Sequence, residues 1–132
     1  MNEDKVETTA VLIISYDYVL RDILTKMLIS KGHKVVNRSV GFHGIRTFEK
    51  AKGNFDIVLM DSKLPDMNWP TVVRAIRQVS NTTPIFLFKE RKERVDNEQA
   101  QNAGVDLTIP IPIYMDNTYE RIKNALDNRA GS

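Results

Sequence analysis

Short apolar runs alternate along the chain with segments whose apolar positions recur at helical spacing. The runs are strand-length and rich in β-branched or aromatic residues, which predicts five strands. They cover residues 10–14, 34–37, 55–60, 84–88 and 106–109. The helical periodicity predicts five helices, at residues 18–32, 41–52, 69–78, 91–103 and 118–126. Such alternation is typical of an α/β protein, with a parallel sheet covered by helices on both faces.

The order of these segments leaves few topologies open. Crossovers between parallel strands are right-handed, and a five-stranded sheet of this kind is expected to be doubly wound, (βα)5 and flavodoxin-like, with strand order 2-1-3-4-5. Asp61 then lies at the carboxyl edge where the first and third strands are neighbours. We expect one domain over residues 9–128, after a flexible lead-in at 1–8 and before a tail or linker start at 129–132.

Composition and charge exclude several classes of protein. Of the 132 residues, 42% are hydrophobic and 27% charged, as in ordinary globular domains. No apolar run is long enough to span a bilayer, and no secretory leader pattern is found, so we expect a cytoplasmic protein. The absence of cysteine excludes thiolate metal sites. A net charge of +2 without a basic stripe gives no reason to expect nucleic-acid binding.

Four segments together carry a resemblance to a known family. They are VLIISYDYVLRDIL (11–24), FDIVLMDSKLPDM (55–67), TPIFLF (83–88) and AGVDLTIPIP (103–112). In order and spacing they resemble the receiver domain of two-component response regulators, the CheY-like family. In that family an aspartate at the end of the third strand accepts a phosphoryl group with the help of Mg²⁺. The resemblance therefore implies that Asp61 is the candidate phospho-acceptor.

The positions that support this chemistry in the family hold other residue types here. They are the acidic pair that binds Mg²⁺, the hydroxyl residue ending the fourth strand, the lysine before the fifth-strand proline, and the aromatic residue that reports activation. In this chain they fall on Ser15 and Tyr16, Lys89, Ile111 and Thr108, respectively. The proline is present, and the resemblance implies a cis bond before Pro112. The chain thus resembles a degenerate pseudo-receiver, and we expect it to bind no metal or other cofactor. Mg²⁺ is the cofactor that the family's usual site would bind.

The missing acidic pair changes the electrostatics expected around Asp61. Two carboxylates ~4 Å apart repel by about 4 kcal/mol at an effective dielectric near 20, so the family's usual site requires a lysine and a metal. Without the pair, a partly buried Asp61 still needs a partner. Lys89, at the end of the neighbouring strand, is the candidate counter-ion. Alternatively, backbone N–H groups of the following loop hold Asp61, and Lys89 is a solvated charge of the run KERKER (89–94).

Three further features bear on capping and contacts. Asp17 is expected to cap the first helix. Trp69 stands where the family has glycine, and is either a surface anchor for a partner or buried against its loop. In the apolar segment IPIPIYM (109–115), Ile113, Tyr114 and Met115 would form a contact patch if exposed; otherwise they pack against the last helix.

The leading functional hypothesis is an atypical receiver in phosphorelay signalling that binds a protein, with impaired Mg²⁺-dependent phosphorylation. A histidine kinase, an output domain or a second copy (a homodimer) are the partners considered; no membrane contact is expected. The alternative is a functioning phospho-acceptor that uses Asp61 with a non-standard metal site, and Mg²⁺ dependence separates the two. No glycine-rich phosphate loop follows any strand, which disfavours a nucleotide-dependent enzyme. At most, self-catalysed phosphoryl transfer to Asp61 is expected.

Overall fold

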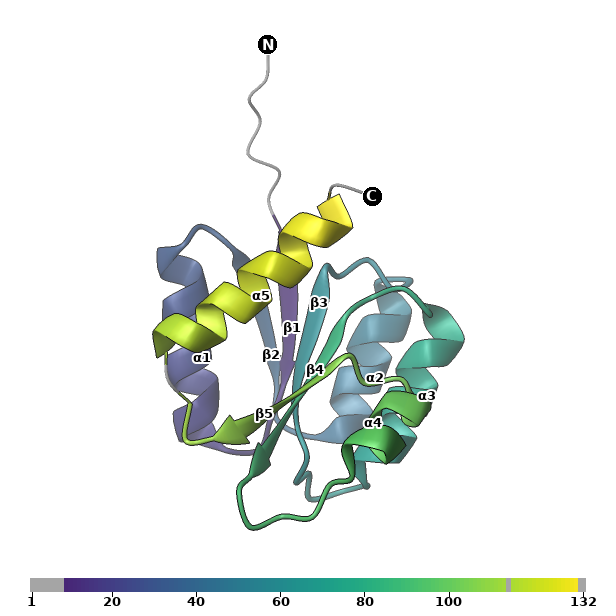
Figure 1. Ribbon diagram of the computed structural model, residues 1–132. Helices are drawn as coiled ribbons and strands as arrows, with labels where there is room; N and C mark the ends of the chain where they lie inside the picture. Colours follow the sequence, from purple (N-terminus) through teal and green to yellow (C-terminus); the bar gives the residue numbers. More distant parts are fainter. Residues whose placement is uncertain (1–8, 114, 131–132) are drawn as a thin grey trace.

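The computed structural model describes residues 9–113 and 115–130 of the chain, in which five strands alternate with five helices. The strands are β1 (Ala10–Ile14), β2 (Lys34–Arg38), β3 (Ile57–Asp61), β4 (Ile85–Glu90) and β5 (Leu107–Ile111). All neighbouring pairs are parallel, in the order β2-β1-β3-β4-β5 (Figure 1). The predicted doubly wound fold is confirmed.

Five helices cover the two faces of the sheet. They are α1 (Tyr18–Ser30), α2 (Gly41–Lys50), α3 (Trp69–Val79), α4 (Asn97–Ala103) and α5 (Met115–Ala130). Helices α1 and α5 lie on one face, and α2, α3 and α4 on the other (Figure 1). None of the helices in the described part of the chain is long and apolar enough to cross a membrane.

The central strands are buried on both sides, and their side chains alternate between two cores. Leu12 and Ile14 pack with the α2–α4 layer, whereas Val11 and Ile13 pack with α1 and α5. Every residue of β3 is buried. Because strand side chains alternate between faces, a continuous apolar run is what a central parallel strand requires.

Helix α4 is shorter than the sequence predicts. The prediction placed it at 91–103, but it begins at Asn97 with Asp96 as its cap, whose side chain accepts from the Glu98 N–H (3.0 Å). Residues 91–96 are mostly charged and have no apolar stripe to bury. No burial therefore offsets the conformational entropy lost in ordering another helical turn. The segment instead forms the β4–α4 loop, which borders the site described below.

The C-terminal helix is longer than predicted. Helix α5 starts at Met115 and runs through Ala130, past the predicted helix end at 126 and the predicted domain boundary at 128. The proposed lead-in at 1–8 and residues 131–132 of the proposed tail lie outside the described residues.

Helix α2 approaches the sheet closely, which explains a glycine in its interior. A Cβ added at Gly44 would lie 2.5 Å from Cδ1 and 2.7 Å from Cγ1 of Ile14. Only glycine, which has no side chain, allows this approach. Close packing against β1 therefore requires glycine at this position, although glycine has a low helix propensity. Gly44 is therefore compatible with the helix predicted at residues 41–52.

Candidate functional site

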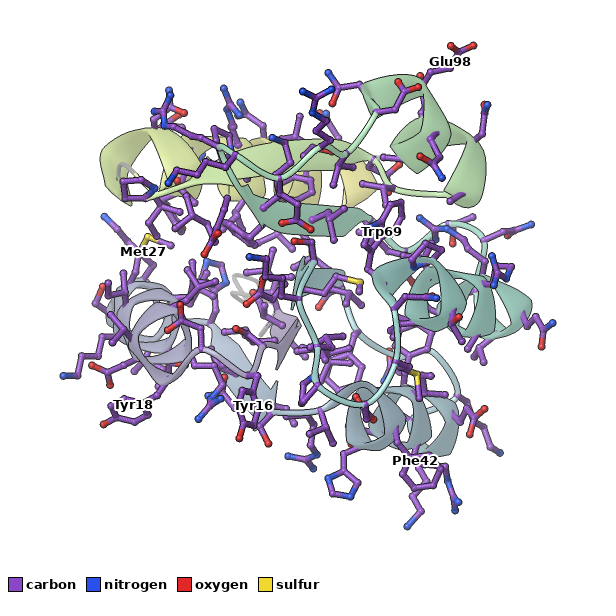
Figure 2. All side chains as sticks on the ribbon, turned by 90° about the horizontal axis from the view of Figure 1, so that it is seen from below. Tyr16, Tyr18, Met27, Phe42, Trp69 and Glu98 are labelled. Atoms are coloured by element: carbon purple, nitrogen blue, oxygen red, sulfur yellow. The ribbon has the colours of Figure 1, made fainter. Side chains whose placement is uncertain are left out.

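Asp61 lies where the carboxyl ends of β1 and β3 meet. The two strands pair in parallel, with Ile14 opposite Met60, so the residues that follow each strand end reach the same edge of the sheet. Figure 2 looks onto this edge. Asp61 itself is buried, with 7% of its surface exposed. The sequence-predicted candidate acceptor is therefore at the expected edge, but little of it is open to solvent.

Two hydrogen bonds hold the Asp61 carboxylate. The Ser15 hydroxyl donates to Oδ2 (3.1 Å) and the Lys63 backbone N–H donates to Oδ1 (3.2 Å). The Ser15 hydroxyl also accepts the Asp17 backbone N–H (3.1 Å), so it links the β1–α1 loop to β3. Ser15 thus supplies a neutral donor at the position where the family has a carboxylate.

Burial raises the pKa of Asp61 above its ordinary value of 3.8. The hydrogen bonds from Lys63 and Ser15 oppose this rise, while the nearby carboxylates of Asp17 and Glu93 add to it. The charged neighbours that raise this pKa, Asp17 and Glu93, are both acidic. The charged form of Asp61 is therefore held mainly by hydrogen bonds. The Lys63 ammonium, whose pKa is raised chiefly by its bond to Glu90 and to a lesser extent by Asp61, also interacts with it electrostatically.

The predicted pairing of Lys89 with Asp61 is wrong. Lys89 Nζ contacts two carbonyl oxygens of its own loop, those of Glu93 (3.3 Å) and Glu90 (3.5 Å). In the β3–β4 register Asp61 is opposite Phe88, whose side chain packs in the core under α1 and α5. Because side chains alternate, the next residue, Lys89, projects from the other face of the sheet. The alternative from backbone hydrogen bonding holds instead, with the addition of Ser15.

A second acidic residue near Asp61 comes from the β4–α4 loop. The Ser62 hydroxyl donates to Glu93 Oε1 (2.6 Å), and Lys63 Nζ pairs with Glu90 Oε1 (3.0 Å). These contacts join the loops that follow β3 and β4. Glu93 was not predicted from the sequence, since the run KERKER has no periodicity that distinguishes an inward-facing carboxylate from solvated ones.

The first turn of α1 confirms the role expected of Asp17. Its Oδ1 accepts the backbone N–H groups of Val19 (2.9 Å) and Leu20 (3.2 Å). Arg21 Nη1 donates to the Ser15 carbonyl oxygen (2.6 Å), which orients the loop around the Ser15 hydroxyl. Tyr16 points outward and is 62% exposed (Figure 2). The two acidic-pair positions therefore hold a buried serine and an exposed tyrosine.

The positions at the other end of the site are occupied by apolar or neutral residues. Ile111 and Ile113 pack against the core under α1 and α5, so the predicted exposed patch is wrong for Ile113 and the packed alternative holds. The bond between Ile111 and Pro112 is cis, as predicted. Thr108 is half-buried on β5. Tyr114 and the side chain of Met115 lie outside the described residues.

Trp69 is buried and not a surface anchor. It begins α3, only 8% of it is exposed, and it packs in the core beneath α2–α4 (Figure 2). A large aromatic side chain at a first helical turn has enough apolar area to fill the gap between helix and sheet. Of the two sequence-based alternatives for Trp69, burial is the one observed.

Possible metal ligands are sparse. In the portion of the chain that the structure describes, no three His, Cys, Asp or Glu side chains come together in a way that could hold a metal ion. Near Asp61, Asp17 already caps α1 and Glu93 accepts from Ser62. The carboxylates close enough to act on Asp61 are thus engaged in other contacts.

The similarity of this chain to a known family extends over nearly the whole domain. The model of the response regulator receiver domain matches residues 11–123. The chain belongs to the response regulator receiver family. Relatives in this family include the uncharacterized transcriptional regulatory protein YcbL of Bacillus subtilis, 28% identical over 115 residues, or 87% of this chain and 50% of that protein. The transcriptional regulatory protein KdpE of Mycobacterium tuberculosis is 30% identical over 118 residues, 89% of this chain and 51% of that protein.

The receiver thus spans about half the length of these curated relatives. Solved structures share its fold. A two-component response regulator from Clostridium difficile superimposes with a TM-score of 0.84 at 25% identity, covering 95% of this chain and 100% of that one. A CheY-like receiver from Methanospirillum hungatei gives a TM-score of 0.85 at 23% identity, covering 95% and 98%.

Proposed function

We propose that this receiver acts in two-component signalling mainly as a protein-binding module, with impaired Mg²⁺-dependent phosphorylation of Asp61. The observation that carries the proposal is the Ser15–Asp61 hydrogen bond, which puts a neutral hydroxyl where the family's acidic pair begins. Receivers are in general not enzymes, and nothing beyond self-phosphorylation would be catalysed here.

The donor set around Asp61 does not fit Mg²⁺ well. Magnesium prefers octahedral oxygen ligation that usually includes carboxylates. Ser15 is neutral, Tyr16 points away from the site, and the Asp17 carboxylate faces the α1 amides. Phosphoryl transfer also needs cations that neutralise the transferring oxygens. Ile111 replaces the family's lysine and packs in the core, and Lys89 is bonded to its own loop.

Exposed apolar side chains at the same edge support a binding role. Tyr16 and Tyr18 are 62% and 69% exposed, and Val19 beside them is also exposed. Tyr16 and Tyr18 project outward along one side of the molecule, and so does Phe42 from α2 (Figure 2). Aromatic side chains are enriched at protein interfaces. The partners considered are a histidine kinase, an output domain and a second copy of the chain.

Backbone amide NMR tests the proposal directly. Spectra would be recorded for the wild type with and without Mg²⁺, and then with beryllofluoride, which mimics a phosphoryl group on aspartate. We expect no shifts centred on Asp61. Shifts at Asp61 and Ser62 that disappear in Asp61→Ala would overturn the proposal.

A matched gain-of-function variant makes a negative result informative. It restores the family's residue types through Ser15→Asp, Tyr16→Asp, Lys89→Thr and Ile111→Lys. If these positions account for the impairment, the variant acquires Mg²⁺-dependent beryllofluoride shifts that the wild type lacks. A variant that folds and stays silent would assign the impairment to other residues.

One observation favours the alternative, a working acceptor with a non-standard metal site. Burial has the largest effect on the pKa of Asp61 and raises it, and the hydrogen bonds from Lys63 and Ser15 lower it. Asp17 and Glu93 also lie close enough to Asp61 to raise its pKa. If their carboxylates moved off Ser62 and the α1 amides, they could add oxygen ligands. Under this alternative, Mg²⁺ shifts the Asp61 and Glu93 amides, and Glu93→Gln removes the response.

A further inference from the structure

A basic groove opens beside α2, away from the Asp61 site. Its volume is about 430 Å³, within the range of small-molecule sites. Four side chains that can carry positive charge line it: Arg38, His43, Arg46 and Lys50. No aspartate or glutamate is among its lining residues in the described part of the chain.

Three of these side chains share one face of α2. His43, Arg46 and Lys50 are three and four residues apart, so they stack along successive turns of the helix. Arg46 and Lys50, four residues apart, are like charges at neutral pH, and like charges at this spacing destabilise a helix. The polar face of α2 therefore concentrates positive charge toward the groove at an energetic cost.

Arg38 faces them from the end of β2, the edge strand. Its Nε donates to Thr47 Oγ1 (2.7 Å) and its Nη1 donates to the Asn37 carbonyl oxygen (2.7 Å). These two bonds fix the plane of a half-buried guanidinium. Among the described residues, no hydrogen bond or ion pair engages its remaining nitrogen, Nη2. An oriented guanidinium with a nitrogen to spare is a suitable donor for an anion.

The positive charge of this groove is only weakly compensated, whereas three other cationic side chains form short ion pairs. Arg77, Lys63 and Lys123 each pair with a carboxylate at 3.0 Å. In the groove, the ion pair of Arg46 with Glu49 is long, at 3.8 Å, and both side chains are about half exposed. Arg38 has no carboxylate partner among the described residues. The groove thus has an excess of positive charge that an anion would neutralise.

We propose that this groove binds a small phosphate-bearing molecule. Arginine and several cationic neighbours suit a tetrahedral, multiply charged oxyanion better than a single carboxylate, because they can donate to several oxygens at once. Ala51 and Phe55 line the groove as well and offer apolar surface to the body of such a ligand. None of these residues belongs to the Asp61 site, so the inference does not depend on the function proposed above.

Titration of the labelled full chain with pyrophosphate tests the proposal. Amide shifts are followed at constant ionic strength and without divalent metal. We expect saturable shifts confined to Arg38, to α2 from His43 onward, and to Phe55. Arg38→Gln should weaken binding about tenfold through loss of a charge-assisted hydrogen bond. The matched control, Arg74→Gln, makes the same charge change on the exposed side of α3 and should leave affinity unchanged.

Further arms separate the proposal from general charge attraction. Lys50→Gln, on an exposed helix end, is a second variant in case Arg38→Gln does not fold, and it should also weaken binding. Asp61→Ala should bind pyrophosphate as the wild type does. The proposal is overturned if millimolar pyrophosphate gives no saturable shift, or if Lys26 and Lys123 respond as strongly as Arg38. Equal affinity for citrate, or tighter binding of a single-stranded oligonucleotide at these amides, would also overturn it.

Discussion

At the scale of single residues, the Asp61 site depends on the hydroxyl of Ser15. A carboxylate at this position would repel Asp61, whereas the hydroxyl donates to it and accepts from the Asp17 N–H. A buried carboxylate without a counter-ion is costly. Two hydrogen bonds lower that cost, although burial still keeps the pKa of Asp61 raised. The result is a carboxylate that is easier to protonate than an exposed one.

Replacing Ser15 should change the titration of Asp61, and replacing Lys89 should not. Ser15→Ala removes a bond that lowers the pKa of Asp61, so that pKa should rise further above its ordinary value. Lys89→Thr should leave it unchanged, because Lys89 Nζ contacts the Glu90 and Glu93 carbonyl oxygens. Carboxyl ¹³C chemical shifts followed against pH measure both. A rise in Lys89→Thr would restore the counter-ion hypothesis.

Asp61→Asn should stabilise the protein at neutral pH. The pKa of Asp61 is raised in the folded state, so the folded state holds its proton more tightly than the unfolded one. The ionised carboxylate therefore costs stability at neutral pH, and this cost disappears as pH falls through the folded pKa toward 3.8. We expect Tm to rise at neutral pH and to be unchanged at a pH below 3.8, where the carboxyl is protonated in both states.

The control for Asp61→Asn is Asp127→Asn on the exposed side of α5, where Tm should change little. The Ser15 hydroxyl can rotate to accept the new amide, so the substitution need not leave an unpaired group. A loss of stability in Asp61→Asn at neutral pH would mean that the charged form is favoured in the fold.

At the scale of elements, helix α2 is capped by a residue from a distant loop. Three other helices carry their own cap: Asp17 before α1, Asn68 before α3 and Asp96 before α4. The residue before α2 is Val40, which has no polar side-chain atom. Asp66, from the β3–α3 loop, accepts the backbone N–H groups of α2 instead. The loop after Asp61 is thereby attached to α2.

Removing this cap should destabilise the fold. Asp66 Oδ1 and Oδ2 accept the Gly41 and Phe42 N–H groups, each at 2.8 Å, and Asp66→Ala should cost about 1 kcal/mol in urea unfolding. Asp66→Asn, which keeps one acceptor, should cost less. Burial raises the pKa of Asp66, but the bonds from Phe42 and Gly41 lower it more. Its contribution is therefore present above the ordinary value of 3.8 and is lost as pH falls through the lower folded pKa.

Gly44→Ala tests the close approach of α2 to β1. Alanine has the higher helix propensity by about 1 kcal/mol, but its Cβ would lie within 3 Å of two atoms of the fully buried Ile14. Overpacking typically costs about 1–3 kcal/mol. We expect a net loss of stability in urea unfolding; a net gain would show that Ile14 can move aside.

At the scale of the whole molecule, Arg77 joins four elements through one side chain. It donates to the carbonyl oxygens of Gly104, Ser80 and Thr83 and to the Asp106 carboxylate. These partners lie at the end of α4, after α3, before β4 and before β5. Burial lowers the pKa of Arg77, opposed by Asp106, and the guanidinium stays charged. It stabilises the half of the sheet that contains β4 and β5.

Arg77→Met should cost about 3 kcal/mol, because it keeps the aliphatic packing but leaves partly buried carbonyl oxygens without a donor. Urea unfolding measures this loss of stability. An unchanged m-value would show that the substitution changes stability and not the surface exposed on unfolding. Arg74→Met, on the exposed part of the same helix, is the control and should change stability by less than about 0.5 kcal/mol. Similar small effects in both variants would contradict the assigned role.

Local pattern was sufficient to predict most of the fold and part of the site. The apolar runs of β1 and β3 and the cap at Asp17 depend on neighbours a few residues away, and all were predicted correctly. The start of α4 was predicted wrongly. The charged run 91–96 has no hydrophobic periodicity, so the sequence does not show where the loop ends and the helix begins. The direction of Lys89 was missed for another reason, since it depends on the register between β3 and β4.

The sequence by itself determined that Asp61 ends an apolar strand and that Ser15 and Tyr16 follow the first strand, because residue type and position along a strand are local properties. Only the tertiary structure decided what surrounds Asp61. The bonds from Ser15 and Ser62, the cap that Asp66 supplies to α2, and the groove at Arg38 each join segments far apart in the chain. Such contacts depend on how strands pair and how helices pack, which no local pattern specifies.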